Sequence, residues 1–104
     1  MDKNLIKHKI KTAITQEDAD AKVILFGSRA KGTETSESDW DILVLLNKPH
    51  ISFKDEQKIR HKLFDIELEA GQTIATFVYS IADWNSRFSV TPLYLNIQRE
   101  GVYL

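Results

Sequence analysis

Two aspartates separated by one residue, Asp39 and Asp41, are the side chains of this sequence best suited to chemistry. They stand at the start of an apolar run typical of a β-strand, in which side chains alternate between the two faces. Both carboxylates are therefore expected on one side, roughly 7 Å apart along the strand. Because like charges repel and are costly to desolvate, such a pair favours a divalent cation between them. Mg²⁺ suits one or two carboxylates with water and phosphate oxygens, and such sites clamp phosphates during phosphoryl or nucleotidyl transfer.

A glycine and a serine, Gly27 and Ser28, directly follow a short apolar run at Lys22–Phe26. A glycine there allows a sharp turn and a close approach of the backbone to a ligand. The free N–H groups of the turn, with the Ser28 hydroxyl, are suited to holding a phosphate. Arg29 and Lys31 add positive charge beside that anion, and a guanidinium can donate to two phosphate oxygens. The same two cations also suit a solvated surface.

The Gly-Ser pair, ten intervening residues and the Asp-x-Asp pair resemble the signature of the DNA polymerase beta nucleotidyltransferase superfamily. The longer string Phe26–Gly32, followed by Ser38–Val44, is similar to that of minimal nucleotidyltransferases, which are small single domains. The resemblance implies that the Gly-Ser turn binds the nucleotide triphosphate and that the two aspartates bind the metal. Arg29 and Ser38, inside the same string, are further candidates for contact with the nucleotide, although a serine here also suits a turn hydrogen bond.

The resemblance also implies an activity and partners. Family members transfer a nucleoside monophosphate from ATP or another nucleoside triphosphate to a hydroxyl, with Mg²⁺ or Mn²⁺, and release pyrophosphate. Minimal members are often paired with a helical HEPN-type protein as antitoxin and toxin, and some attach AMP to a tyrosine of the toxin. We therefore expect a metal-dependent nucleotidyltransferase that acts on a protein or RNA partner. The alternative is a nucleotide-binding module that works by covering its partner.

One part of the family pattern is missing. Family enzymes carry a third carboxylate on the next core strand, where it helps to hold the metal or to activate the attacking hydroxyl. That strand here is the run Thr73–Tyr79, which has no Asp or Glu. The equivalent position falls near Ala75, Thr76 or Phe77. Either the domain turns over slowly or not at all, or an acidic residue of the preceding helix reaches in. The acidic residues that could do so are Asp65, Glu67 and Glu69.

The elements that would position these residues follow from hydrophobic periodicity and from cap signals. Strands are expected at Lys22–Phe26, Asp41–Leu46 and Thr73–Tyr79. Helices are expected from Leu5 to about Asp18, from Ser52 or Asp55 to Gly71, and over Leu93–Glu100 after Pro92. Ser28 is expected to cap a short helical turn and Asp83 another around Trp84. Trp40 alternates away from the aspartates and is expected in the core. The order predicts one α+β domain over residues 1–104, a small mixed sheet with helices packed against it.

Composition sets the remaining bounds. The 104 residues include no Cys, so the chain has no disulfide framework or thiolate metal site, which favours the cytoplasm. Lys and Arg total 14 against 15 Asp and Glu, a balance that argues against bulk binding to nucleic acid. The longest apolar run, Ile42–Leu46, is far too short to span a bilayer, and we expect neither a signal peptide nor membrane association. His8, His50 and His61 lack metal-ligand spacing. Association into a homo-oligomer remains open.

Overall fold

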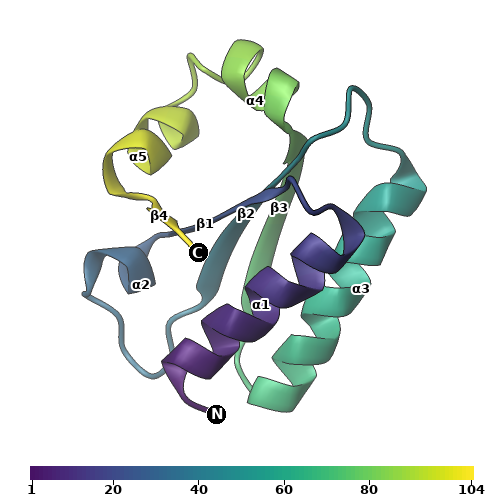
Figure 1. Cartoon of the computed structure of the whole chain (residues 1–104). Helices are drawn as coiled ribbons and strands as arrows, with labels where there is room; N and C mark the ends of the chain where they lie inside the picture. The colour runs from purple at the N-terminus through teal and green to yellow at the C-terminus, as the bar shows by residue number, and fades with distance from the viewer.

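The computed structural model describes residues 1–104 as a four-stranded sheet with helices on both faces (Figure 1). Helices α1 (Lys3–Glu17) and α3 (Phe53–Ala70) pack against each other and cover one face. Helices α4 (Ile81–Ser86) and α5 (Pro92–Glu100) cover the other. The short helix α2 (Ser28–Lys31) follows the first strand directly. This arrangement confirms the predicted α+β class.

The sheet is mixed, as the sequence predicts. Strands β1 (Lys22–Phe26), β2 (Trp40–Leu46), β3 (Ile74–Ser80) and β4 (Val102–Tyr103) lie in the order β3-β2-β1-β4. β2 runs antiparallel to β1 and parallel to β3, and β4 runs antiparallel to β1. Parallel neighbours need a long crossover connection, and α3 supplies the one between β2 and β3.

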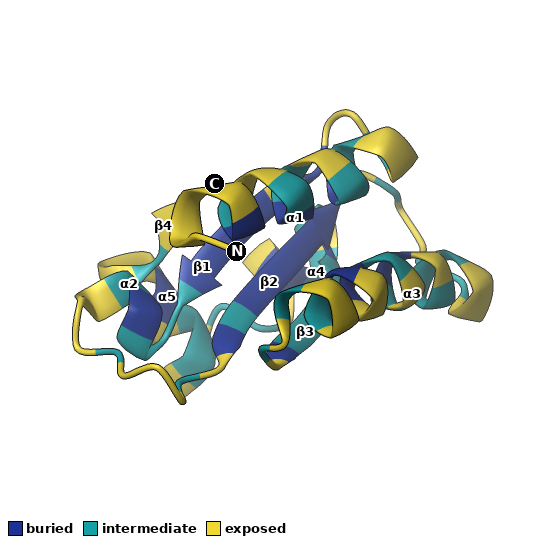
Figure 2. Cartoon of the chain, turned by 90° about the horizontal axis from the view of Figure 1, so that it is seen from below, coloured by how far each residue is buried: buried dark blue, intermediate teal, exposed yellow.

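The first helix begins two residues before its expected start at Leu5 and ends at Glu17 rather than Asp18. Asp2 caps it, because the Asp2 carboxylate accepts a hydrogen bond of 2.8 Å from the backbone N–H of Leu5. Along α1, three isoleucines at helical spacing face the sheet and are fully buried, whereas the outward side is exposed (Figure 2). These are Ile6, Ile10 and Ile14.

The predicted capping box at Ser52 begins α3. The Ser52 hydroxyl accepts from the backbone N–H of Asp55 at 3.0 Å, and the Asp55 carboxylate accepts from the N–H of Ser52 at 3.2 Å. The hydrogen bond from Lys48, together with those from Ser52, lowers the pKa of Asp55 to about 2. Gly71 ends the helix with a φ of 67°, as predicted. Neither α3, the longest helix, nor any other helix is long and apolar enough to cross a membrane.

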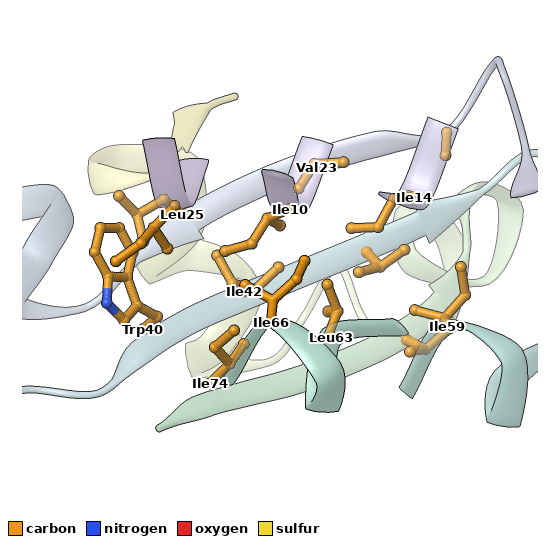
Figure 3. Packing of buried hydrophobic residues seen from close by; sticks show 14 of the residues in the cluster. Ile10, Ile14, Val23, Leu25, Trp40, Ile42, Ile59, Leu63, Ile66 and Ile74 are labelled. Carbon is orange, nitrogen blue, oxygen red and sulfur yellow. The ribbon is translucent and has the colours of Figure 1, made fainter. Parts of the chain in front are cut away.

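The main core fills the space between the sheet and the α1–α3 pair (Figure 3). Alternate residues of β1 and β2 point into it and meet the buried faces of the two helices. Trp40 lies beside Leu25 at one end of this core and is only 1% exposed (Figure 3). The prediction that Trp40 packs in the core is therefore confirmed.

The opposite face of the sheet carries a smaller core made with the C-terminal helices. It contains five buried residues: Ile24, Leu43, Leu45, Trp84 and Ile97. Ser80, not Asp83, caps α4, since the Ser80 hydroxyl accepts from the N–H of Asp83 at 3.0 Å. The predicted cap at Asp83 is thus wrong by one helical turn. Pro92 opens α5 as predicted. The sequence did not indicate β4, because two residues are too short for a periodic pattern.

Candidate active site

Gly27 joins the end of β1 to α2 with a φ of 74°, a value that side chains strongly disfavour. Because β1 and β2 are antiparallel, Phe26 at the end of β1 pairs with Asp41 near the start of β2. This register brings the turn against the Asp41 side chain. A Cβ added at Gly27 would overlap Asp41 Oδ2 and lie 3.1 Å from Asp41 Cγ. The sharp turn predicted at Gly27 is therefore present, and only glycine fits there. The close neighbour is the Asp41 carboxylate, and the predicted approach to a ligand stays a prediction.

Helix α2 differs slightly from its predicted form. Gly27 is its N-cap and Ser28 its first residue, so the expected cap by the Ser28 side chain is wrong. The Gly27 carbonyl accepts from the N–H groups of Ala30 and Lys31 at 3.1 and 3.2 Å. The N–H groups of Ser28 and Arg29 stand ahead of these first helical bonds, so they have no acceptor within the helix. The turn thus presents two backbone donors next to the Asp41 carboxylate.

Asp41 shares a face of the sheet with Leu43 and Leu45, and Trp40 points to the opposite face. Asp39 is exposed and Asp41 is half-buried. Burial raises the pKa of Asp41, and the nearby charge of Asp39 raises it further. The two carboxylates are therefore close enough for their charges to interact. That they share one side stays a prediction, because Asp39 precedes β2 and lies outside its strand alternation.

The donor set of this pair fits a hard divalent cation. Neither aspartate forms a salt bridge with a lysine or arginine, so both carboxylates are available to a ligand. Two carboxylates with open positions for water and phosphate oxygens match what Mg²⁺ requires. No third His, Cys, Asp or Glu joins them. Asp39 and Asp41 could thus hold Mg²⁺ or Mn²⁺ with part of its coordination left to a bound phosphate.

The parallel pairing of β2 and β3 shows which residues occupy the position where family enzymes carry the third carboxylate. Asp41 pairs with Ala75, and Leu43 pairs with Phe77. Paired residues share a face, so Ala75 and Phe77 lie on the side of the aspartates, whereas Thr76 lies on the other. The position nearest Asp41 is therefore occupied by a methyl group.

The acidic residues of α3 do not replace it. α3 covers the sheet face opposite the aspartates, because its buried residues pack in the core that contains Trp40. Glu67 accepts a hydrogen bond of 2.8 Å from the N–H of Ile74, and Glu69 pairs with Lys9 of α1. Asp65, on the same helix, lines hollows beside α1 and β3. The suggestion that Asp65, Glu67 or Glu69 supplies the third carboxylate is therefore wrong.

The remaining predicted nucleotide contacts occupy defined places in the loop. Arg29 is buried, and its guanidinium donates to the Ser38 backbone carbonyl. The Ser38 hydroxyl accepts from the N–H of Thr35 at 2.9 Å, which is the turn hydrogen bond anticipated for it. Lys31 pairs with Glu100 of α5 at 3.2 Å. The assignment of Arg29 and Ser38 as nucleotide ligands stays a prediction.

Sequence reasoning missed Gln72, which follows Gly71 at the end of α3. Its side-chain oxygen accepts from Trp40 Nε1 at 2.6 Å and from Arg29 Nη2 at 3.3 Å. No local signal could have found it, because a polar residue between a helix and a strand is ordinary. The role of Gln72 depends on the crossover, which brings this loop beside the start of β2.

The family model of the nucleotidyltransferase domain matches residues 7–93 of the chain. That span runs from α1 into α5 and contains Gly27, Ser28, Asp39 and Asp41. In a comparison with curated proteins, the chain matches none.

Proposed function

This chain belongs to the nucleotidyltransferase domain family, whose general activity is nucleotidyl transfer, and from that premise we propose how its site works. We propose that the protein transfers AMP from ATP, with Mg²⁺ or Mn²⁺, to a hydroxyl of a protein or RNA partner. The observation that carries the proposal is the contact of the Gly27 turn with Asp41, beside a second carboxylate on Asp39. The backbone donors proposed for the phosphates would thus adjoin the carboxylates proposed for the metal.

In this proposal, different residues bind the metal and the phosphates. Asp39 and Asp41 would hold the metal, which when bound neutralises charge on the triphosphate and orients it for attack. The N–H groups of Ser28 and Arg29 would receive the phosphates, and Gly27 lets them approach the carboxylates. In the reaction, the acceptor oxygen bonds to the α-phosphorus, the bond to pyrophosphate breaks, and the acceptor proton passes to solvent.

The exposure of the site supports a separate acceptor molecule. Asp39 is exposed and Asp41, Gly27 and Ser28 are half-buried, so the site lies at the rim of the sheet. A macromolecular hydroxyl can reach such a rim directly. A helical HEPN-type protein, with this chain as its antitoxin, is the partner class that we propose, and a tyrosine is the acceptor that its chemistry would offer.

A second candidate function rests on the residues beside Asp41. Ala75 and Phe77 occupy the side of β3 where a third carboxylate would help to hold the metal or take a proton. Without it, the domain would bind nucleotide and metal with little turnover and act by covering its partner. The two candidates share a site and differ in whether AMP is transferred.

Incubation with ATP labelled at the α-phosphate, Mg²⁺ and the protein encoded next to this chain would separate them. Label on the partner that disappears in Asp39→Ala and Asp41→Ala, and persists in Asp20→Ala, supports the enzyme. Asp20 is the matched control because it is an exposed aspartate in the turn before β1. A stable complex with no label transfer supports the binding module instead.

A further inference from the structure

Arg29 is a buried cation in the short helix α2, beside a largely exposed loop. It is 9% exposed, whereas residues 31–33 and 35–37 around it are exposed. A buried guanidinium is costly unless hydrogen bonds and favourable contacts replace its water. Most of the contacts that do so here are with the segment that carries Asp39, and one is with Gln72.

The main contact joins Arg29 to the residue before Asp39. Arg29 Nε and Nη2 donate to the backbone carbonyl of Ser38 at 3.1 and 2.8 Å. Two donors from a planar guanidinium to one oxygen restrict both the direction and the distance of that carbonyl. The peptide that joins Ser38 to Asp39 is therefore held from one side.

Contacts on the residue after Asp39 complete the arrangement. The Arg29 guanidinium lies 4.5 Å from the centroid of the Trp40 ring, and both side chains hydrogen-bond to Gln72 Oε1. The Trp40 backbone N–H also donates to the Thr73 carbonyl at 2.9 Å. Asp39 thus lies between two fixed residues, while its own carboxylate is left free for a ligand.

We infer that Arg29 and Gln72 are positioning residues, which hold the Ser38–Trp40 segment so that the Asp39 carboxylate stays beside Asp41 for metal binding. The inference rests on the proposed function, because it needs a metal on the two aspartates. It also differs from the expectation that Arg29 contacts phosphate. The guanidinium stacks on Trp40, which faces away from the aspartates, and it is already engaged with protein oxygens.

Titration with Mn²⁺ alone, without nucleotide, separates positioning from every purely electrostatic effect. Removal of a positive charge near a cation site strengthens cation binding by Coulomb's law. Loss of a positioning residue weakens it. Arg29→Met keeps the length and apolar stem of the side chain and removes its donors. We expect its Mn²⁺ dissociation constant, measured by calorimetry, to rise about tenfold. An unchanged or lower constant would overturn the inference.

Three further variants make the test decisive. Gln72→Leu removes the shared acceptor without a change of charge, and we expect it to weaken Mn²⁺ binding about threefold. It carries the test if Arg29→Met does not fold, as judged by circular dichroism, and unchanged binding in it would contradict the inference. Arg60→Met is the matched control, because Arg60 also donates to a backbone carbonyl, that of Thr76, but from α3 on the opposite face. Its Mn²⁺ binding should equal that of the wild type.

Asp39→Asn distinguishes failure of this inference from failure of the proposed function. If Asp39→Asn binds Mn²⁺ as tightly as the wild type, the proposed metal site itself is wrong. If Asp39→Asn loses Mn²⁺ while Arg29→Met and Gln72→Leu retain it, the metal site stands and only the positioning role fails.

Discussion

The backbone of Gly27 lies directly against the carboxylate of Asp41, so closely that any side chain at residue 27 would overlap an Asp41 oxygen. The contact joins the end of β1 to the start of β2, and the antiparallel register of these strands sets it. It brings the two parts of the motif, at the end of β1 and the start of β2, into one place. The turn that would receive phosphates and the carboxylates that would hold the metal adjoin at one end of the two central strands.

Gly27→Ala should lower the stability of the protein and weaken metal binding, because a side chain at residue 27 would overlap the Asp41 carboxylate. Gly32 is the reference for a positive φ in open space, since it is left-handed helical (φ 79°, ψ 17°) and a Cβ there would meet nothing within 4 Å. Gly27 combines the overlap with Asp41 and a conformation almost confined to glycine (φ 74°, ψ −159°). We expect Gly32→Ala to lower the free energy of unfolding by about 1 kcal/mol and to leave Mn²⁺ binding unchanged. Gly27→Ala should lower it by about 2–3 kcal/mol and weaken Mn²⁺ binding. Equal effects of the two substitutions on urea unfolding and on Mn²⁺ binding would contradict the close approach of Gly27 to Asp41.

Asp41 should cost the protein stability in the absence of metal. Burial, and then the charge of Asp39, raise its pKa in the folded state. A raised carboxyl pKa means that the folded state holds the proton more tightly than the unfolded state, so stability falls as the pH rises through that pKa. In EDTA at pH 7, Asp41→Asn should therefore raise the Tm.

The gain in Asp41→Asn should vanish below the ordinary carboxyl pKa of 3.8, where Asp41 is protonated in both states. Mn²⁺ should raise the Tm of the wild type and not that of the variant, because the variant lacks one of the two proposed metal ligands. A lower Tm for the variant at pH 7 in EDTA would show that the fold stabilises the ionised carboxylate.

Ala75→Asp should tighten metal binding, since residue 75 pairs with Asp41 and shares its face. A third carboxylate beside the pair adds an oxygen ligand and negative charge, and we expect the Mn²⁺ dissociation constant to fall about tenfold. Thr76→Asp, one residue along on the opposite face, is the control and should leave it unchanged. The assignment of faces would be wrong if the control tightened binding and Ala75→Asp did not.

Asp55 should stabilise the protein only above strongly acidic pH. Its hydrogen bonds with Lys48 and Ser52 lower its pKa from 3.8 to about 2. The stabilisation is therefore complete above pH 3.8 and is lost as the pH falls through 2. Asp55→Asn should melt at a lower temperature than the wild type at pH 6, and the difference should shrink toward pH 2. A difference that stays constant with pH would assign the effect to helix propensity instead of the carboxylate.

The parts of the fold that depend on local signals followed from the sequence. The isoleucines of α1, the capping box at Ser52 and Pro92 at the start of α5 each act within one or two helical turns, so spacing alone reveals them. β4 could not be predicted, because its two residues are ordered only by pairing with β1. The cap at Ser80 was missed because Ser80 and Asp83 are both good caps, and strand length decided between them.

The candidate site also has a part that local sequence signals predict and a part that depends on the tertiary fold. Trp40 could be placed on the face opposite Asp41 because strand alternation is strict. Asp39 precedes β2, so its place on the same side as Asp41 stays a prediction. The contacts of Arg29 could not be predicted, because its partners Ser38 and Gln72 are brought to it by a loop and by the crossover after β2. The failure of the α3 acidic residues to reach the site has the same cause, since the crossover determines which face a helix covers.

Paramagnetic line broadening by Mn²⁺ in ¹⁵N-labelled protein tests the central claim most directly, because it locates the bound ion relative to each backbone amide. We predict that sub-stoichiometric Mn²⁺ first broadens the amide resonances of residues 27–29 and 39–41, and that Asp39→Asn abolishes the effect. Broadening centred on the acidic residues of α3, or unchanged in Asp39→Asn, would contradict a metal site at Asp39 and Asp41.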